Sequence, residues 1–257
     1  MTENSPARRE RSRVWLVLPA FNEEQSLPTL LDRIEEAMFE ANLDFRIVIV
    51  DDGSSDTTPK IIEEAAEHLP LTVVNHPVNL GLGAAIRDGL LEAARSASPR
   101  DVIVTLDSDN THTPDLILRM VRSVREGHDV VIASRYQPGS RVRGVPFVRR
   151  LMSRAASIVF RVLFPTHGVR DFTSGYRAYR AEVMQKVITS HGETFFDQDG
   201  FQVMVDIVLK LRRDRSLIFT EVPLILRYDL KDGASKMDVA ATVKNTLRLA
   251  LRRRLGR

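Results

Sequence analysis

The chain has 257 residues, of which 43% are hydrophobic, and a formal net charge of +3. That length is enough for a full hydrophobic core in one large domain or two small ones. The lack of cysteine excludes disulfides and thiolate metal sites and fits a reducing compartment. No apolar run approaches the roughly 20 residues that span a bilayer, so we expect a soluble or peripheral protein and not a polytopic one.

Basic residues gather in two stretches of the sequence. Between residues 135 and 180, Asp171 is the single acid among many arginines. A second cluster lies between Lys244 and Arg257, again without an acid. Such blocks indicate partners that carry phosphate, namely a nucleotide, an anionic lipid or a nucleic acid. For the C-terminal cluster, a solvated helix face is an equally good interpretation.

Residues 1–13 are polar, and we expect a disordered lead there instead of a signal peptide. Short β-branched runs without polar alternation follow, which is typical of strands buried on both faces. The predicted strands are residues 14–18, 47–50, 71–74, 102–106 and 130–133.

Helical patterns lie between these strands. Ser26 precedes an apolar helix face, and Pro59 suits the first turn of a second helix. Further helices are predicted over 83–97 and from about residue 113. The alternation predicts an α/β fold whose mainly parallel sheet is covered by helices on both faces.

The second half of the chain is less regular. Residues 145–164 mix apolar side chains with arginines, which indicates one or two amphipathic helices. Their apolar residues belong either to the core or to an interfacial helix whose arginines face lipid headgroups. A helix over 200–211, strands over 218–226 that break at Pro223, and a basic amphipathic helix over 239–255 complete the prediction. No repeat or linker divides the chain, so one domain with a C-terminal elaboration is expected.

Polar residues stand directly after the predicted strands, where open α/β sheets bind their ligands. After the fourth strand, Asp107 and Asp109 could chelate a hard divalent cation, and Mg²⁺ or Mn²⁺ held there would bridge a diphosphate. The alternative is a simple turn, since Asp-Ser-Asp also favours turns.

Other polar motifs have both a structural and a functional interpretation. Asp51 and Asp52 could accept hydrogen bonds from a base or a ribose, or could merely belong to a turn. Residues 79–83, Asn-Leu-Gly-Leu-Gly, form either a strand-to-helix turn or a bare backbone that a ligand approaches. The absence of G-x-G-x-x-G after the first strand argues against an NAD enzyme. His112, His167 and His191 lack metal-ligand spacing and are expected to be ordinary surface or turn residues.

The ordered motifs resemble a family 2 glycosyltransferase with the GT-A fold. They are residues 19–23 (PAFNE), 50–56 (VDDGSSD), 79–83 (NLGLG) and 106–109 (LDSD). Motifs further on resemble the polyprenyl-phosphate (dolichol-phosphate) mannosyl- and glucosyltransferase branch. These are residues 133–136 (ASRY), 138–140 (PGS), 149–154, 171–177 (DFTSGYR) and 233–236 (GASK), so that the resemblance covers roughly residues 14 to 237.

This resemblance implies roles for particular residues. The nucleotide-sugar site would contain Pro19, Phe21, Glu23, Asp51 or Asp52, and Ser108. Asp107 and Asp109 would hold the metal. The acceptor phosphate would be gripped by Arg135, Arg149 and Ser153, with Arg177 and Lys236 near the phosphates. A phosphate acceptor is already an anion, so it needs arginines that orient it and no general base, and single displacement inverts the anomeric carbon.

Two departures from the family pattern affect this assignment. Phe21 stands where the family often has tyrosine, so a hydroxyl contact is lost. Asp197-Gln198-Asp199 replaces the Glu-Asp base of many enzymes that act on hydroxyls, which favours a phosphate acceptor. Asp197 or Asp199 nevertheless remains a candidate base for a sugar hydroxyl.

The sequence therefore predicts inverting transfer of a hexose from a GDP- or UDP-sugar to a polyprenyl phosphate. Transfer to a hydroxyl is the alternative, and a non-catalytic basic protein that binds membranes is a third possibility; no nucleic-acid partner is expected. The expected domains are a GT-A domain over 14–237 and a basic helix over 238–257, which could bind the membrane or a membrane-anchoring partner. The expected location is the cytoplasm, peripheral at the cytoplasmic face of the membrane.

Overall fold

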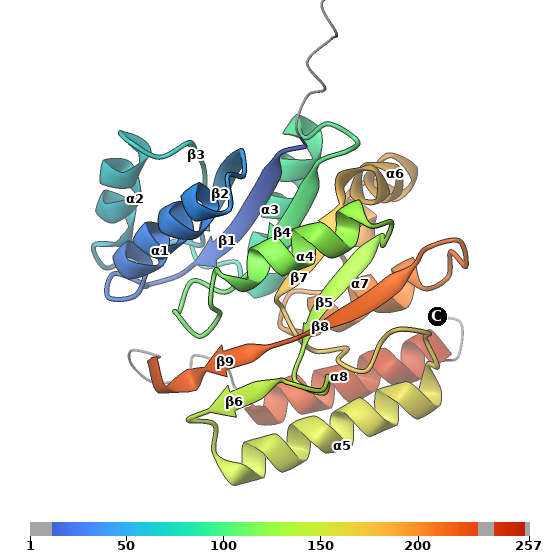
Figure 1. Cartoon of the computed structure of the whole chain (residues 1–257). Coiled ribbons are helices and arrows are strands. Elements are labelled where there is room, and N and C mark those ends of the chain that lie inside the picture. Colours follow the sequence, from blue (N-terminus) through green and yellow to red (C-terminus); the bar gives the residue numbers. More distant parts are fainter. Residues whose placement is uncertain (1–11, 231–238, 255–257) are drawn as a thin grey trace, which may run out of the picture.

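The computed structural model describes residues 12–230 and 239–254, and its centre is a seven-stranded sheet (Figure 1). The strand order is β3-β2-β1-β4-β7-β5-β8. The strands are β1 (Val14–Ala20), β2 (Phe45–Asp51), β3 (Leu71–Asn75), β4 (Val102–Thr105), β5 (Val130–Ser134), β7 (Arg177–Arg180) and β8 (Phe219–Pro223). A small second sheet pairs β6 (Arg141–Arg143) with β9 (Ile225–Arg227) in parallel.

Strand β7 runs antiparallel to both of its neighbours, β4 and β5, whereas the other pairs of the large sheet are parallel. Arg177, at the start of β7, lies opposite Thr105 of β4 and opposite Ile132 of β5. Strands β4 and β5 therefore point the same way and end at the same edge of the sheet. The segment that leads into β7, residues 171–176, passes between those two ends.

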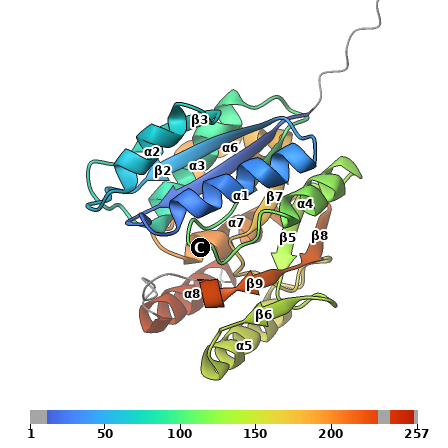
Figure 2. The same cartoon turned by 60° about the vertical axis from the view of Figure 1, so that its left-hand side comes forward.

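Two layers of helices enclose the sheet, as the view in Figure 2 shows. Helices α1 (Leu27–Glu40), α2 (Thr58–Ala66) and α4 (Leu116–Arg125) pack on one face. Helices α3 (Leu82–Ser96), α6 (Ala181–His191) and α7 (Gln202–Leu211) pack on the other. Successive strand residues point to opposite faces, so Val17 belongs to one core cluster while Leu16 and Leu18 belong to the other.

The remaining helices are α5 (Phe147–Leu163), α8 (Val239–Arg254) and the short 3₁₀ helices η1 (Gly192–Phe195) and η2 (Tyr228–Leu230). Helices α5 and α8 lie next to each other below the sheet in Figure 1, and α8 also packs on α7. Within the described part of the chain, no helix combines the length and the hydropathy needed to cross a bilayer.

The α/β fold and its flanking helices confirm the sequence prediction. The predicted apolar face of α1 is buried, and Pro59 lies in the first turn of α2. The strand over residues 71–74 was expected to be buried on both faces, but β3 is an edge strand whose residues are half-buried or exposed. Strands β6 and β7 and helix α6 were not predicted.

Residues near both ends of the described chain contact the rest of the fold. Residues 1–11 lie outside the described residues. Arg13, which was assigned to the disordered lead, donates from its backbone N–H to Asp101 (2.8 Å) and from Nε to Asp44 (2.9 Å). In α8, the buried Leu249 and Ala250 belong to the same core cluster as α7, so this helix packs against the domain.

Candidate active site

Asp107 and Asp109 follow β4 at the edge of the sheet where the parallel strands β1 and β2 also end. Both aspartates are half-buried, and the side chain of Asp107 is 39% exposed. Ser108, between them, is buried and donates from Oγ to the carbonyl of Pro19 at the end of β1 (2.8 Å). This bond ties the loop to β1 and leaves the two flanking carboxylates accessible.

The surroundings of Asp107 come from two separate segments. Gly175 lies beside it, and a Cβ added at Gly175 would be 3.3 Å from Asp107 Oδ1. On its other side, His112 Nδ1 accepts the backbone N–H of Asp107 (3.2 Å) and lies 3.8 Å from Oδ2. His112 is only 5% exposed, so the expectation of an ordinary surface or turn residue is wrong.

Asp109 is oriented by its own loop. Its Oδ1 accepts hydrogen bonds from the hydroxyl of Thr111 (2.6 Å) and from the backbone N–H of the same residue (3.2 Å). An aspartate that bonds to the backbone two residues further on forms a compact turn. The turn interpretation and the metal interpretation are therefore compatible, since both hydrogen bonds of the turn go to Oδ1 of the carboxylate.

Arg135 follows β5 and is joined to Asp171, in the segment that leads into β7. Both carboxylate oxygens of Asp171 accept from the guanidinium, with Nε–Oδ2 at 2.8 Å and Nη2–Oδ1 at 2.6 Å. Burial raises the pKa of Asp171, but the charge and hydrogen bonds of Arg135 outweigh that effect and hold this pKa below its usual value.

The pKa of Arg135 changes in the opposite direction. Burial lowers it, but Asp171 raises it above the ordinary arginine value, with smaller contributions from Tyr136 and Asp107. Arg135 is thus close enough to Asp107 for their charges to interact. The structure brings the predicted acceptor arginine and a predicted metal aspartate into one site.

Helix α5 presents the other two predicted acceptor residues, each in contact with a tyrosine. Arg149 Nη1 donates to the hydroxyl of Tyr228 (2.6 Å), and its guanidinium lies over the Tyr228 ring at 5.5 Å. One turn further on, the hydroxyls of Ser153 and Tyr136 are 2.7 Å apart. Because Tyr136 is adjacent to Arg135, the end of β5 and helix α5 border the same site.

The two aspartates at the end of β2, Asp51 in the strand and Asp52 after it, have different surroundings. Asp52 is 4% exposed and accepts from the backbone N–H groups of Leu80 (2.8 Å) and Gly81 (2.9 Å). His76 Nδ1 lies 2.7 Å from Asp52, and its Nε2 lies 3.0 Å from Asp88. Asp52 therefore anchors the 79–81 loop, and Asp51 is the better candidate for contact with a nucleoside.

The glycines of the 79–83 motif accommodate another segment of the protein. Gly83 donates its N–H to the carbonyl of Asp199 (2.9 Å), and a Cβ at Gly83 would lie only 2.0 Å from the carbonyl oxygen of Gln198. The sequence suggested that a ligand could approach the backbone of this motif. In the structure, residues 198–199 approach it closely.

The two candidate bases of that acidic segment differ in their contacts. Asp197 pairs with Lys210 (2.8 Å) and with Arg253 of α8 (3.0 Å). Burial raises the pKa of Asp197, but hydrogen bonds from Asp206, Lys210 and Gln198 hold it well below the usual value. A carboxylate of such low basicity is a poor general base, so Asp199 is the stronger candidate of the two.

Arg177, which was expected near the phosphates, lies inside the sheet. Its side chain is fully buried in β7, and its guanidinium donates to the carbonyls of Met204 and Phe172 (2.8 Å for the latter). Arg177 therefore joins the sheet to α7. Lys236 lies outside the described residues.

The donor set at the β4 edge fits a hard divalent cation. Asp107 and Asp109 supply carboxylate oxygens, and a side chain at Gly175 would crowd the first of them, since its Cβ would lie 3.3 Å from Asp107 Oδ1. Among the described residues, no cluster of three or more Asp, Glu or His side chains could hold a metal ion by itself. Mg²⁺ commonly binds through one or two carboxylates together with substrate phosphates and water, which matches this arrangement.

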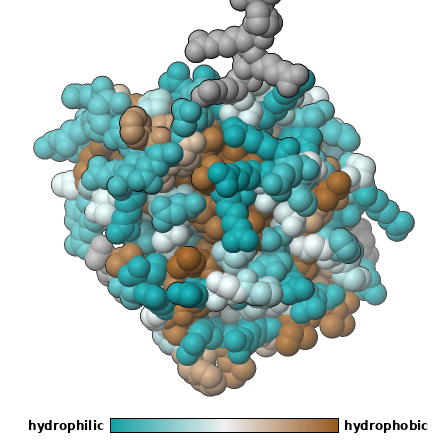
Figure 3. Space-filling model, viewed as in Figure 1, coloured by the Kyte–Doolittle hydropathy of each residue, from teal (hydrophilic) through white to brown (hydrophobic). Residues whose placement is uncertain are grey.

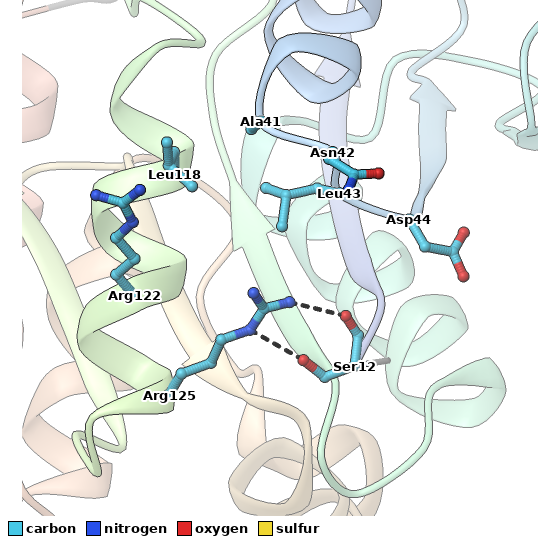
Figure 4. Close-up of a pocket in the computed structure, with 8 residues that line it drawn as sticks. All are labelled: Ser12, Ala41, Asn42, Leu43, Asp44, Leu118, Arg122 and Arg125. Carbon is cyan, nitrogen blue, oxygen red and sulfur yellow. Dashed lines mark hydrogen bonds between the residues drawn. The ribbon is translucent and has the colours of Figure 1, made fainter. Parts of the chain in front are cut away.

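A separate surface hollow lies away from these residues. It has a volume of about 350 Å³ and is formed by residues 41–44, Ser12 and helix α4 (Figure 4). Arg125 of α4 donates there to the hydroxyl (3.1 Å) and to the carbonyl (3.0 Å) of Ser12. The hollow adjoins the amino-terminal ends of β1 and β2, whereas the predicted site residues lie around the carboxyl ends of the strands. It therefore contains none of them.

Residues 15–188 match the sequence model of a family described as glycosyl transferase family 2. The chain belongs to this family and is a glycosyltransferase. It is 32% identical to a dolichol-phosphate mannosyltransferase of Pyrococcus furiosus over 77% of the chain and 53% of the relative, so it spans about half of that protein's length. It is also 32% identical to a polyprenol monophosphomannose synthase of Mycolicibacterium smegmatis, over 89% of the chain and 82% of the relative.

Solved structures support the GT-A fold. Glucosyl-3-phosphoglycerate synthase of Mycobacterium tuberculosis, in complex with Mg²⁺ and UDP, superposes with a TM-score of 0.67. The match covers 95% of this chain and 80% of the other, with 24% sequence identity. At that identity the likeness concerns the fold alone.

Three residues next to the site were not assigned a role from the sequence. Tyr228 lies outside the recognised motifs, and Tyr136 belongs to one but had no role assigned to it. His112, three residues after Asp109, gave the clearest signal, because a polar residue so close to paired aspartates on a strand end is well placed to contact them. The contacts of Tyr136 with Ser153 and of Tyr228 with Arg149 join segments that are apart in sequence and meet only in the fold.

Proposed function

We propose that this glycosyltransferase moves a hexose from a nucleotide diphosphate sugar to a polyprenyl phosphate, with inversion at the anomeric carbon. The supporting observation is that helix α5 carries Arg149 and Ser153 toward the site and an apolar stripe toward the surface. A lipid phosphate needs both features, because its head must reach the sugar while its chain remains in an apolar phase. The names of relatives that act on dolichol phosphate and polyprenol phosphate agree with this acceptor.

The proposed reaction requires few proton transfers. The acceptor phosphate is already an anion, so the protein must orient it and neutralise part of its charge. Arg149 and Arg135 supply charge-assisted hydrogen bonds, and Ser153 supplies a hydroxyl. Tyr228 and Asp171 hold the two arginines before the acceptor arrives, which reduces the entropy lost on binding.

The donor would bind along the carboxyl ends of β1, β2 and β4. Pro19, Phe21, Glu23 and Asp51 are the proposed nucleoside residues, with the diphosphate next to Asp107 and Asp109. A divalent cation held by these two aspartates, Mg²⁺ or Mn²⁺, would neutralise charge on the departing diphosphate. Ser108 contributes by fixing the loop through its bond to Pro19.

We further propose that the protein binds peripherally to the cytoplasmic face of a membrane through α5. Exposed apolar side chains recur along one face of this helix, and exposed arginines flank them. The apolar residues are Phe147, Val148, Leu151, Met152, Ile158, Val159 and Val162. They contribute to the hydrophobic surface at the lower edge of Figure 3, where α5 lies, and an interfacial helix has this combination of faces.

Helix α8 adds exposed basic residues beside α5. Arg248, Arg252 and Arg254 are exposed, as is the apolar Leu251. They could contact the same anionic surface or a membrane-anchoring partner, which is the role proposed for residues 238–257. The proposed domain over 14–237 would then hold the whole catalytic site.

The alternative is transfer to a hydroxyl of a glycan or small molecule, and the exposed side chain of Asp199 is the observation that favours it. Such a reaction needs a base, and the other acidic candidate, Asp197, is already held in ion pairs with Lys210 and Arg253. The acceptor experiment below separates the two reactions.

The deciding experiment supplies defined polyprenyl phosphates in vesicles, glycan and small-molecule hydroxyl acceptors, a panel of radiolabelled GDP- and UDP-hexoses, and Mg²⁺ or Mn²⁺. We expect label in the organic phase that mild acid releases, because a sugar phosphodiester of this kind is acid-labile. Label that appears only in hydroxyl acceptors would contradict the lipid assignment.

The same assay tests the proposed metal site. Asp109→Ala should lower kcat by about 100-fold or more, the scale seen when a group that stabilises transition-state charge is removed. Asp32→Ala, which removes an exposed carboxylate of α1, serves as the matched control. Normal turnover of the Asp109 variant would refute the metal role.

A further inference from the structure

The Asp-Ser-Asp loop contains an imidazole whose orientation bears on the proposed metal site. His112 is 5% exposed, and its Nδ1 accepts the backbone N–H of Asp107 (3.2 Å). A ring nitrogen that accepts a hydrogen bond carries no proton, so the neutral ring has its proton on Nε2. Nδ1 therefore cannot donate to Asp107 Oδ2, although the two atoms are only 3.8 Å apart.

Contacts from three directions hold the ring of His112 in place. It stacks on the ring of Tyr176, with centroids 4.8 Å apart. The Tyr176 hydroxyl in turn donates to the carbonyl of Thr113 (3.0 Å). The backbone of His112 forms an antiparallel bridge with Leu226, and the carbonyl of Thr111 accepts from Arg227 in the same strand, β9 (2.9 Å).

We propose that His112 is a positioning residue for the metal-binding carboxylate of Asp107. Its Nδ1 fixes the direction of the Asp107 backbone, from which that carboxylate extends. Gly175 lies beside the same carboxylate, since a Cβ there would be 3.3 Å from Oδ1. This inference rests on the proposed metal role of Asp107 and Asp109, and it assigns a function to a residue that touches neither substrate.

Two substitutions distinguish the effect of the hydrogen-bond acceptor Nδ1 from the effect of the aromatic ring. His112→Phe keeps an aromatic ring over Tyr176 but removes the acceptor. His112→Asn loses the ring, but its side-chain oxygen is attached at the same Cγ position as Nδ1 and can accept the Asp107 N–H. His167→Phe alters an exposed histidine and serves as the matched control.

The readout is Mn²⁺ affinity, measured by titrating Mn²⁺ into the protein with a fixed amount of UDP or GDP. Free Mn²⁺ is counted from its electron paramagnetic resonance signal, and the titration of nucleotide alone is subtracted. Because groups that orient metal ligands typically contribute 10- to 100-fold to affinity, His112→Phe should raise the Kd for Mn²⁺ about tenfold or more. His112→Asn should bind Mn²⁺ more tightly than His112→Phe, and His167→Phe should match the unchanged protein.

The inference is overturned if His112→Phe binds Mn²⁺ as tightly as the unchanged protein. It is also overturned if His112→Asn is as weak as His112→Phe, since the ring and not the acceptor would then matter. Asp109→Ala distinguishes this result from a failure of the proposed function. If both His112→Phe and Asp109→Ala keep full Mn²⁺ affinity, the metal does not bind at this loop and both proposals fail. If Asp109→Ala loses affinity while His112→Phe keeps it, only the His112 proposal fails.

Discussion

The arginines near the site show how one side chain serves different purposes according to its partners. Arg177 is fully buried and bonds to backbone carbonyls, so it supports the sheet. Arg135 shares its guanidinium with the carboxylate of Asp171 and still interacts with Asp107. Arg149 donates to the hydroxyl of Tyr228 from α5, the helix that also carries Ser153. Of the three arginines, Arg149 is the one that lies beside Ser153 in the proposed acceptor site.

This difference predicts the result of changing Arg149 to lysine. A point charge remains, but the planar fork that grips a phosphate in two places is lost. Because a hydrogen bond to a charged group contributes about 1.5–3 kcal/mol, the KM for a short-chain polyprenyl phosphate should rise roughly tenfold or more. Steady-state kinetics with varied acceptor measure this change, and the neighbouring exposed Arg150→Lys is the control. An unchanged KM would remove Arg149 from the acceptor site.

At the scale of elements, α5 combines two functions because its faces differ. The inward face carries Arg149 and Ser153 beside the end of β5, and the outward face carries the apolar stripe. Strand β9 joins the two halves of the site. It bridges to His112, next to the aspartates, and runs into Tyr228, which holds Arg149. The donor and acceptor sides thus share one short strand.

The exposed stripe of α5 predicts how the protein responds to a charge placed within it. Leu151 is 57% exposed, and burial of such a side chain in lipid contributes about 1.5–3 kcal/mol. Leu151→Asp should therefore weaken binding to anionic vesicles by about tenfold or more. Phe39→Asp changes an exposed apolar residue of α1 and should have no effect. Sedimentation with vesicles measures both variants, and equal binding by the two would contradict an interfacial role for α5.

At the scale of the whole molecule, the ion pair between Arg135 and the buried Asp171 joins the end of β5 to the segment before β7 and contributes to stability. The carboxylate of Asp171 is fully buried between β5 and β7, and the backbone N–H of Asp171 donates to Glu221 of β8 (2.6 Å). The pKa of Asp171 is held below its unfolded value, chiefly by Arg135, which outweighs the effect of burial. Its ionised form therefore stabilises the fold above the unfolded pKa, and that stability is lost as the pH falls through the folded pKa.

Asp171→Asn should consequently reduce the free energy of unfolding at pH 7 by about 3 kcal/mol or more, since it leaves Arg135 without its buried partner. The difference in free energy of unfolding between the variant and the unchanged protein should stay constant above about pH 5. It should narrow below about pH 4, because Asp171 of the unchanged protein then becomes protonated. Urea unfolding along a pH series measures this dependence. A difference that stays constant down to the lowest pH would show that the charge of Asp171 is not responsible.

The sequence by itself determined the order of strands and helices in the first half of the chain and the edge at which the polar residues gather. Periodicity is sufficient there because each of these strands is a run of apolar residues and each helix has one apolar face. The aspartates after β4 and the family could also be read from local motifs. Strand β7 could not be predicted, because its two arginines suggest solvent while tertiary contacts bury Arg177 completely.

Only the tertiary structure decided what each polar residue of the site does. Asp51 and Asp52 are adjacent and identical in type, yet Asp52 bonds to a loop 28 residues away, and this contact is invisible to any local pattern. His112 and Tyr228 are placed beside the site by β9, and the carbonyl partners of Arg177 come from α7 and from the segment before β7. The physical reason is common to all of them. A polar side chain buried by the fold must bond to whatever group the fold brings near it, and that group is rarely a neighbour in sequence.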